Sequence, residues 1–288
     1  MAIELRGVTK RYGATAALDN VSVSFGGGMV YGLLGANGAG KTTMMNVITN
    51  RIYADSGEVL IDGERAPGND RALGKVYMMA EANLFPDSMK VEPALRLTKS
   101  FYPSFDMDCA LAVAKRFELP LKKKVKSLST GYSSIFRLTL ALAVNTPYVI
   151  YDEPVLGLDA QHRDLFYRLL MERAAQTEQT VILSTHLIQE AASLISHAVI
   201  IHSGRILRDM DTAALTGAAY QVSGPAAAVD AYCAGRHVLN ANSLGGLKTA
   251  CVEGEPEAEA PAGLEFAGMD LQDYFISLMN EADRREVK

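Results

Sequence analysis

The sequence predicts an α/β fold in which buried strands alternate with helices. Three short apolar runs, Met29–Leu34, Tyr148–Tyr151 and Thr180–Ser184, have the length and composition of strands buried on both faces of a parallel sheet. Segments with helical periodicity follow the first two runs. With 288 residues, 49% of them hydrophobic, the chain can bury one large core and carry a small appendage.

The N-terminal segment predicts antiparallel strands that are half buried. Apolar and polar residues alternate over Ile3–Arg6 and again over Val21–Phe25, the period of a strand with one exposed face. Tyr12 lies between these strands. A tyrosine at a strand end usually packs against its neighbours, but its ring also offers the flat face that an adenine base needs.

The stretch Gly35–Thr43 reads GANGAGKTT and matches a phosphate-binding P-loop, between the first apolar run and a predicted helix over Met44–Arg51. Its glycines let backbone N–H groups surround phosphate oxygens, Lys41 reaches the terminal phosphates, and the Thr42 hydroxyl ligates Mg²⁺. An ordinary glycine-rich turn is the alternative, although chance seldom produces the full motif in this context. The predicted nucleotide contacts are Asn37, Gly38, Ala39, Gly40, Lys41, Thr42 and Thr43.

The middle of the chain interrupts the alternation of strands and helices. Short strands are predicted at Gly57–Gly63 and Lys75–Met79, but Pro93–Leu119 has helical periodicity, with Leu111, Ala114 and Phe117 on one stripe. We interpret this stretch as a helical insertion. The lysines at positions 122, 123, 124 and 126 then form a basic run that we expect on a solvated face.

The next helix opens with Leu128–Tyr132, which reads LSTGY. Ser129 is placed to cap this helix or, together with Gly131, to present small polar groups to an anion. The residues alone leave both interpretations open.

Two carboxylates, Asp152 and Glu153, end the strand predicted at Tyr148–Tyr151. An acid at the end of an apolar strand needs a cation, a catalytic role or, as the alternative, a helix terminus to cap. For phosphoryl transfer, Asp152 would hold Mg²⁺ directly or through water, and Glu153 would polarise the attacking water. His186 follows the strand Thr180–Ser184. Because ligands bind at the carboxyl ends of parallel strands, we expect His186 at the same sheet edge.

The last part of the chain predicts a hairpin and then a small α+β appendage. Ala198–His202 and Arg205–Leu207 are joined by the turn signal Ser203-Gly204. Farther on, alanine, glycine and acidic residues dominate. The elements predicted there are strands at Tyr220–Val222 and Lys248–Val252 and a helix around Leu271–Leu278.

Composition excludes several classes of protein. The net charge is −5. Residues 217–288 hold 5 basic and 11 acidic groups, and the residues before them hold 23 basic and 22 acidic groups. This balance argues against nucleic acid as a partner. Three distant cysteines without metal-ligand spacing, and no signal peptide, predict reduced thiols in the cytosol. No apolar run is long enough to span a membrane, so a role there needs a partner.

The chain resembles the ATP-binding cassette (ABC) ATPases in an ordered set of motifs: Tyr12, the P-loop, LSTGY at 128–132, YVIYDEP at 148–154, GLD at 157–159 and His186. The resemblance covers about residues 1–216. It implies a P-loop NTPase cassette with an antiparallel β subdomain and a helical subdomain at about residues 93–145. Residues 217–288 would then be a small C-terminal accessory domain of α+β type.

The resemblance also implies ATP and Mg²⁺ as cofactors and a head-to-tail homodimer or pseudo-dimer that sandwiches two ATP molecules. Ser129 and Gly131 of one subunit would face the P-loop of the other. Tyr12 would stack on adenine, His186 would join in catalysis by contacting the γ-phosphate, and Asp159 would contact nucleotide and bridge the subunits. Closure on ATP and opening after hydrolysis would do the mechanical work.

A finer resemblance is to bacterial ATPases of exporters with separately encoded membrane subunits, carried by FYPSFD at 101–106, LPLKKK at 119–124 and DLQDYF at 270–275. It implies an integral membrane permease as partner and a cytoplasmic location on the inner face of the membrane. One alternative is a soluble cassette ATPase acting on ribosomes or DNA, which usually has two cassettes, a long coiled coil or zinc cysteines. Another is a P-loop kinase or GTPase, which has no use for LSTGY.

One position departs from the family pattern. ABC ATPases usually place a glutamine after the strand that ends here near Met79, and Ala80 occupies that position, with Glu81 next. Ala80 has no ligating group. Glu81 is either a substitute Mg²⁺ ligand or a solvated loop acid, and the sequence leaves both open.

Overall fold

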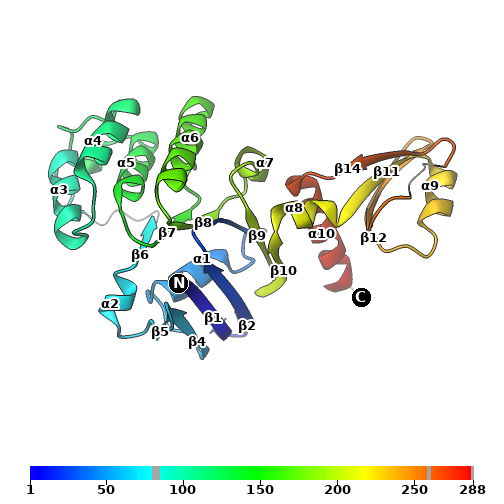
Figure 1. Cartoon of the computed structure of the whole chain (residues 1–288), viewed down its shortest axis with the longest axis horizontal. Helices are drawn as coiled ribbons and strands as arrows, with labels where there is room; N and C mark the ends of the chain where they lie inside the picture. The colour runs from blue at the N-terminus through cyan, green and yellow to red at the C-terminus, as the bar shows by residue number, and fades with distance from the viewer. Residues whose placement is uncertain (80–84, 258–260, 287–288) are drawn as a thin grey trace.

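The computed structural model describes residues 1–79, 85–257 and 261–286. A six-stranded sheet forms its centre, in the order β10-β9-β3-β8-β7-β6 (Figure 1). Neighbouring strands are parallel except β10, which pairs antiparallel with β9. The strands are β3 (Val30–Leu34), β6 (Val76–Met79), β7 (Tyr148–Asp152), β8 (Thr180–Ser184), β9 (His197–His202) and β10 (Arg205–Asp211). The α/β fold is thus confirmed.

A second sheet, antiparallel throughout, has the order β2-β1-β4-β5. It packs with the P-loop helix against one face of the central sheet, because Phe25, Met44 and Ile150 share one buried cluster. The alternation at the N-terminus therefore predicted the buried side correctly. The elements of this layer are β1 (Ala2–Tyr12), β2 (Thr15–Gly26), α1 (Lys41–Ile48), β4 (Ser56–Ile61), β5 (Glu64–Arg65) and α2 (Asp70–Leu73).

A helical lobe lies beyond the β6 side of the central sheet (Figure 1). It contains α3 (Val91–Phe101), α4 (Met107–Arg116), the short 3₁₀ helix η1 (Val125–Ser127) and α5 (Thr130–Ala143). The predicted helical stretch is two helices, since Pro103 follows α3 and Asp106 caps α4 by accepting the Cys109 N–H at 2.9 Å. Leu111 does not belong to the buried stripe, and it is 38% exposed. The stripe is Ala110, Val113, Ala114 and Phe117.

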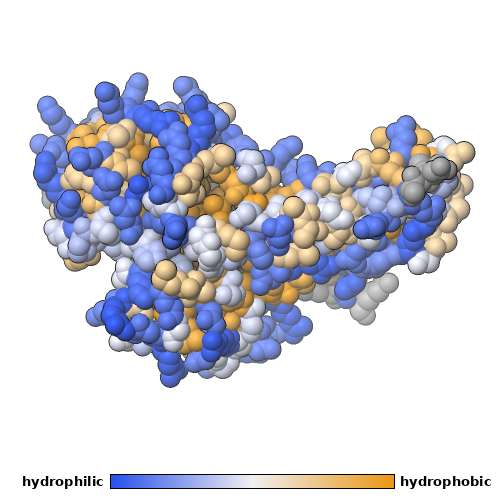
Figure 2. Space-filling view, viewed as in Figure 1, coloured by the Kyte–Doolittle hydropathy of each residue, from blue (hydrophilic) through white to orange (hydrophobic). Residues whose placement is uncertain are grey.

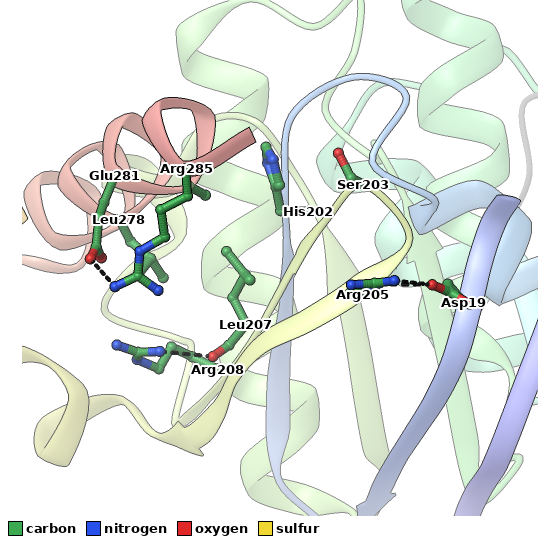
Figure 3. A pocket seen from close by; sticks show the side chains of 10 residues that line it. Asp19, His202, Ser203, Arg205, Leu207, Arg208, Leu278, Glu281 and Arg285 are labelled. Atoms are coloured by element: carbon green, nitrogen blue, oxygen red, sulfur yellow. Dashed lines mark hydrogen bonds and ion pairs between the residues drawn. The ribbon is translucent and has the colours of Figure 1, made fainter. Parts of the chain in front are cut away.

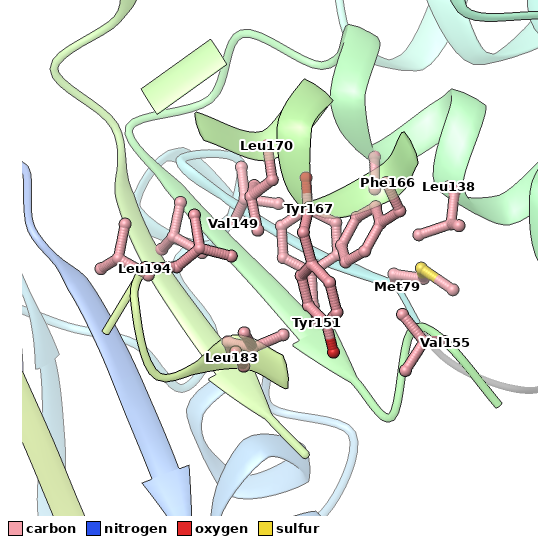
Figure 4. Packing of buried hydrophobic residues seen from close by; sticks show 14 of the residues in the cluster. Met79, Leu138, Val149, Tyr151, Val155, Phe166, Tyr167, Leu170, Leu183 and Leu194 are labelled. Atoms are coloured by element: carbon pink, nitrogen blue, oxygen red, sulfur yellow. The ribbon is translucent and has the colours of Figure 1, made fainter. Parts of the chain in front are cut away.

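The other face of the central sheet is covered by α6 (Ala160–Gln176), with the short helix α7 (Ile188–Ala191) nearby. The ring of Tyr151 of β7 lies 5.6 Å from that of Phe166 in a tilted contact, and the ring of Phe166 lies 5.3 Å from that of Tyr167 (Figure 4). Burial of these rings fixes the end of β7 in place. The two acidic residues that follow Tyr151 therefore start from a rigid support.

A third sheet, with the order β12-β13-β11-β14, has its own small core and extends to one side of the molecule (Figure 1). The terminal helix α10 does not belong to that core: Leu271, Tyr274 and Leu278 join the large cluster beneath the central sheet. The elements are α8 (Thr212–Gly217), β11 (Ala219–Pro225), α9 (Ala226–Cys233), β12 (Val238–Leu244), β13 (Leu247–Glu253), β14 (Glu265–Gly268) and α10 (Leu271–Glu286). Across the described ranges, no helix has both the length and the apolar character of a membrane span.

Candidate functional site

The P-loop connects β3 to α1 through two glycines that no larger residue can replace. A Cβ on Gly35 would lie 2.5 Å from the Ile201 carbonyl oxygen, and one on Gly40 would lie 2.3 Å from that of Ala17. Gly40 also has φ +112° at the start of α1, a conformation that side chains rarely adopt. The N-terminus of α1 and the backbone N–H groups of the loop can therefore approach an anion closely.

Lys41 is buried inside this loop. Its Nζ donates to the Gly35 carbonyl at 2.6 Å and to the Ala36 carbonyl at 3.1 Å. Burial lowers the pKa of the ammonium group, against the opposing effect of Glu153 and Asp152. Among the residues that the structure describes, no carboxylate contacts this desolvated cation, and a phosphate would supply an anionic partner.

Thr42 and Asp152 come together from different elements. The Thr42 hydroxyl of α1 donates to Asp152 Oδ2 at 3.4 Å, at the end of β7. Burial, and secondly the charge of Glu153, raises the pKa of the Asp152 carboxyl. A buried carboxylate beside a hydroxyl is a set of hard oxygen donors that suits Mg²⁺, so these residues fit the ion that the motif predicts. No cluster of three or more His, Cys, Asp or Glu suited to a metal occurs in the described part of the chain.

Glu153 and His186 also meet at this sheet edge. Glu153 Oε2 lies 2.7 Å from His186 Nδ1, and the Glu153 backbone N–H donates to the Ser184 carbonyl at 3.0 Å. The backbone of Glu153 has φ +45°, a left-handed conformation that is uncommon for a residue with a side chain. The structure therefore gathers Lys41, Thr42, Asp152 and this pair at the carboxyl ends of β3, β7 and β8, the edge of a parallel sheet where ligands usually bind.

The β9–β10 turn supports the P-loop from behind, a feature that the sequence did not reveal. The Gly204 N–H donates to the Ala39 carbonyl at 3.0 Å, and the Asp19 N–H donates to the Gly204 carbonyl at 2.9 Å. Arg205 Nη2 lies 2.6 Å from Asp19 Oδ2 and ties the turn to β2 (Figure 3). The only signal in the sequence was the Ser203-Gly204 turn itself, and a turn signal does not predict that the turn will contact the P-loop.

The residues predicted to contact a second subunit lie apart from the P-loop contacts. Ser129 caps α5 by accepting the Tyr132 N–H at 3.3 Å, so its capping role is realised. A Cβ on Gly131 would lie 3.4 Å from the Gly157 carbonyl. Asp159 caps α6 and accepts from the His162 N–H at 2.9 Å and from His162 Nδ1 at 2.8 Å, bonds that lower its pKa. Ser129 and Asp159 are exposed.

Two predicted positions remain. Tyr12 is 53% exposed at the end of β1, and Lys10 Nζ lies 5.8 Å from its ring centroid, so the ring is partly accessible from solvent. Ala80 and Glu81 lie outside the described residues. The structure thus brings together the P-loop, Asp152, Glu153 and His186, and leaves Tyr12, Ser129, Gly131 and Asp159 on exposed or half-exposed surfaces around them.

Comparison with known proteins independently supports the resemblance to the ABC ATPases. A family model described as "ABC transporter" matches residues 18–156. The "ABC transporter ATP-binding protein YtrB" of Bacillus subtilis is 30% identical over 209 residues, 73% of this chain and 72% of that protein. The "Nod factor export ATP-binding protein I" of Burkholderia orbicola is 36% identical over 211 residues, 70% and 68% of the two chains.

Solved structures resemble about three quarters of the chain. One described as the ATP-binding subunit of an ABC transporter has a TM-score of 0.67 at 24% identity, over 75% of this chain and 92% of that one. A dimeric bacterial ABC transporter cassette has a TM-score of 0.64 at 25% identity, over 73% of this chain and 98% of that one.

Proposed function

The chain belongs to the ABC transporter ATP-binding proteins, and we propose that it is the ATPase subunit of an exporter with a separate membrane permease. The observation that carries the chemistry is the meeting of Lys41, Thr42, Asp152 and Glu153 at one sheet edge. Such a set has the parts that phosphoryl transfer to water needs: a phosphate-binding cation, a metal-binding carboxylate and a base.

Each residue has a distinct part in the proposed mechanism. Lys41, which now donates to two loop carbonyls, would donate to phosphate oxygens instead. Thr42 and Asp152 would hold Mg²⁺, an ion that supplies positive charge beside a phosphoryl group. Glu153 accepts a proton from the attacking water. Tyr12 offers its partly accessible ring to adenine.

His186 needs a change before it can contact a phosphate. An ionised Glu153 can only accept, so the 2.7 Å bond places a proton on His186 Nδ1. We propose that nucleotide binding turns the His186 ring away from Glu153, so that the Nδ1–H can donate to a phosphate oxygen instead.

We further propose that the active unit is a head-to-tail dimer. Ser129 and Asp159 are exposed caps of α5 and α6, where they present helix N-termini and polar atoms to a partner. A relative of known structure at 25% identity is described as a dimer. In this arrangement Ser129 and Gly131 would complete the nucleotide site of the opposite subunit.

The export role rests on relatives named for Nod factor export and on the three short exporter-like stretches. It places the subunit in the cytoplasm, against the inner face of the membrane. The test is co-expression with a membrane protein encoded beside this gene, followed by purification in detergent. We expect a stable complex whose Mg·ATP hydrolysis exceeds that of the isolated chain. A chain that instead co-purifies with ribosomes or DNA, and with no membrane protein, would refute the proposal.

A further inference from the structure

Five exposed lysines form one basic surface on the helical lobe, which we call the lysine patch: Lys90, Lys122, Lys123, Lys124 and Lys126. They come from two segments, the start of α3 and the approach to α5. A backbone bridge pairs Lys90 with Lys124, and the Val91 N–H donates to the Lys123 carbonyl at 3.0 Å. The fold itself therefore brings the lysines together.

Few carboxylates neutralise this patch. Lys126 pairs with Asp87 at 2.6 Å, whereas the other four lysines make no ion pair with any residue that the structure describes. The nearby Glu92 is already paired with Arg96 at 2.9 Å. Because the whole chain has a net charge of −5, the patch is a local excess of positive charge on an acidic protein.

The make-up of the patch favours one class of partner. Val125 is buried, and Met89 and Leu121 are half-buried, so no apolar residue described within these two segments is fully exposed. Figure 2 shows hydrophilic side chains over much of the helical lobe. Protein interfaces usually have an apolar or aromatic centre and are depleted in lysine. Anionic lipid headgroups need only hydrated positive charge, which lysine supplies.

We propose that the lysine patch binds anionic phospholipid headgroups. This goes beyond the proposed function, which requires only a protein partner in the membrane. The contact is electrostatic, so it acts within about 10 Å of the surface at ordinary ionic strength and weakens with salt. It would hold the helical lobe against the membrane and orient the subunit for its permease.

The test is flotation of the purified full chain with phosphatidylcholine vesicles that contain or lack phosphatidylglycerol. We expect binding to the anionic vesicles alone, lost at high salt. The triple variant Lys122→Gln, Lys123→Gln, Lys124→Gln should bind about a hundredfold more weakly, from roughly fivefold per lysine. Its Mg·ATP hydrolysis in solution should match that of the unaltered chain, which separates failure of this proposal from failure of the proposed ATPase.

The matched control removes three exposed arginines elsewhere: Arg65→Gln, Arg71→Gln and Arg168→Gln, whose side chains are 75%, 77% and 59% exposed. It changes the net charge equally and should bind vesicles like the unaltered chain. Equal binding by both triple variants, or no binding by the unaltered chain, would overturn the proposal. So would binding of polyglutamate, but not of vesicles, through these lysines, because that result would identify an acidic protein segment as the partner.

Discussion

The Glu153 carboxylate and the His186 imidazole hold each other at 2.7 Å across the ends of β7 and β8. The two side chains are therefore partners of each other, and each also has a proposed task toward the nucleotide. The left-handed backbone of Glu153 and its N–H bond to Ser184 keep the carboxylate at this place. This contact links the two residues to which the proposed mechanism gives separate tasks.

The first prediction concerns Glu153→Gln. The amide has nearly the same shape but cannot accept a proton from water, so we expect hydrolysis to fall by about 10²–10⁴-fold while ATP still binds. Turnover and equilibrium binding of a fluorescent ATP analogue measure the two effects. The control is Glu178→Gln, an exposed acid, which should leave both unchanged. Near-normal turnover in a variant that binds ATP would mean that another group is the base.

The second prediction concerns the support of the P-loop. A Cβ on Gly204 would meet the Ala16 and Ala17 carbonyl oxygens at 3.0 Å, where φ is +76°, so Gly204→Ala should shift the turn and its N–H bond to Ala39. We expect ATP affinity to fall about tenfold, consistent with roughly 1–2 kcal/mol of strain and a displaced loop. Turnover at saturating ATP should change less.

Gly245→Ala is the matched control, because Gly245 also has positive φ, +61°, but nothing lies within 4 Å of its added Cβ. It introduces a similar backbone strain far from the nucleotide. If both variants bind ATP alike, the β9–β10 turn has no special role in positioning the P-loop.

The sequence predicted local features better than long-range ones. β3, β7 and β8 are mostly apolar, with polar residues only at strand ends, and the backbone of the P-loop depends on Gly35 and Gly40, so the sequence predicted both features. The hydrogen bond between Gly204 and Ala39 joins backbone atoms of residues far apart in the chain. Any residue except proline can make such a bond, so the pattern of side chains does not predict it. The break between α3 and α4 was missed because apolar spacing continues across it.

The third prediction concerns the terminal helix. Tyr274 is fully buried in the cluster shared with the central sheet, and its hydroxyl accepts from Arg208 Nε at 3.0 Å. Tyr274→Phe should cost about 1 kcal/mol of unfolding free energy, and Tyr274→Ala about 3–5 kcal/mol, as a cavity replaces the ring. Denaturant unfolding measures both. Equal costs for the two variants would contradict a role of the ring in the main core.

The fourth prediction is a pH dependence at the base of the third sheet. His237 Nε2 lies 2.8 Å from Glu281 Oε1 on α10, and its Nδ1 contacts Glu253 Oε2 on β13. Hydrogen bonds to Glu253, and secondly to Glu281, raise the pKa of His237. Two arginines also face this group: Arg208 of β10 pairs with Glu253 at 3.1 Å, and Arg285 of α10 pairs with Glu281 at 2.5 Å.

Because the folded chain binds the proton of His237 more tightly than the unfolded chain, this group stabilises the fold fully below its ordinary pKa of about 6.5. That stabilisation is lost as the pH rises through the raised folded-state pKa. Burial raises the pKa of Glu253, but the hydrogen bond from His237 and the charge of Arg208 outweigh it, so the pKa is lowered. The stabilisation that Glu253 gives to the fold is therefore lost as the pH falls through this lowered pKa. The cluster should therefore stabilise most at mildly acidic pH.

We expect His237→Gln to reduce the unfolding free energy by roughly 0.2–1 kcal/mol near pH 6, because the side chain of His237 is 46% exposed and solvent screens its charge. The difference between the variant and the unaltered chain should shrink as the pH rises through the raised folded-state pKa of His237, because the imidazole then becomes neutral in both states. Thermal unfolding across this range measures it, with His162→Gln as a control in a separate contact to Asp159. A difference that stays constant with pH would show that His237 acts only through packing and neutral hydrogen bonds.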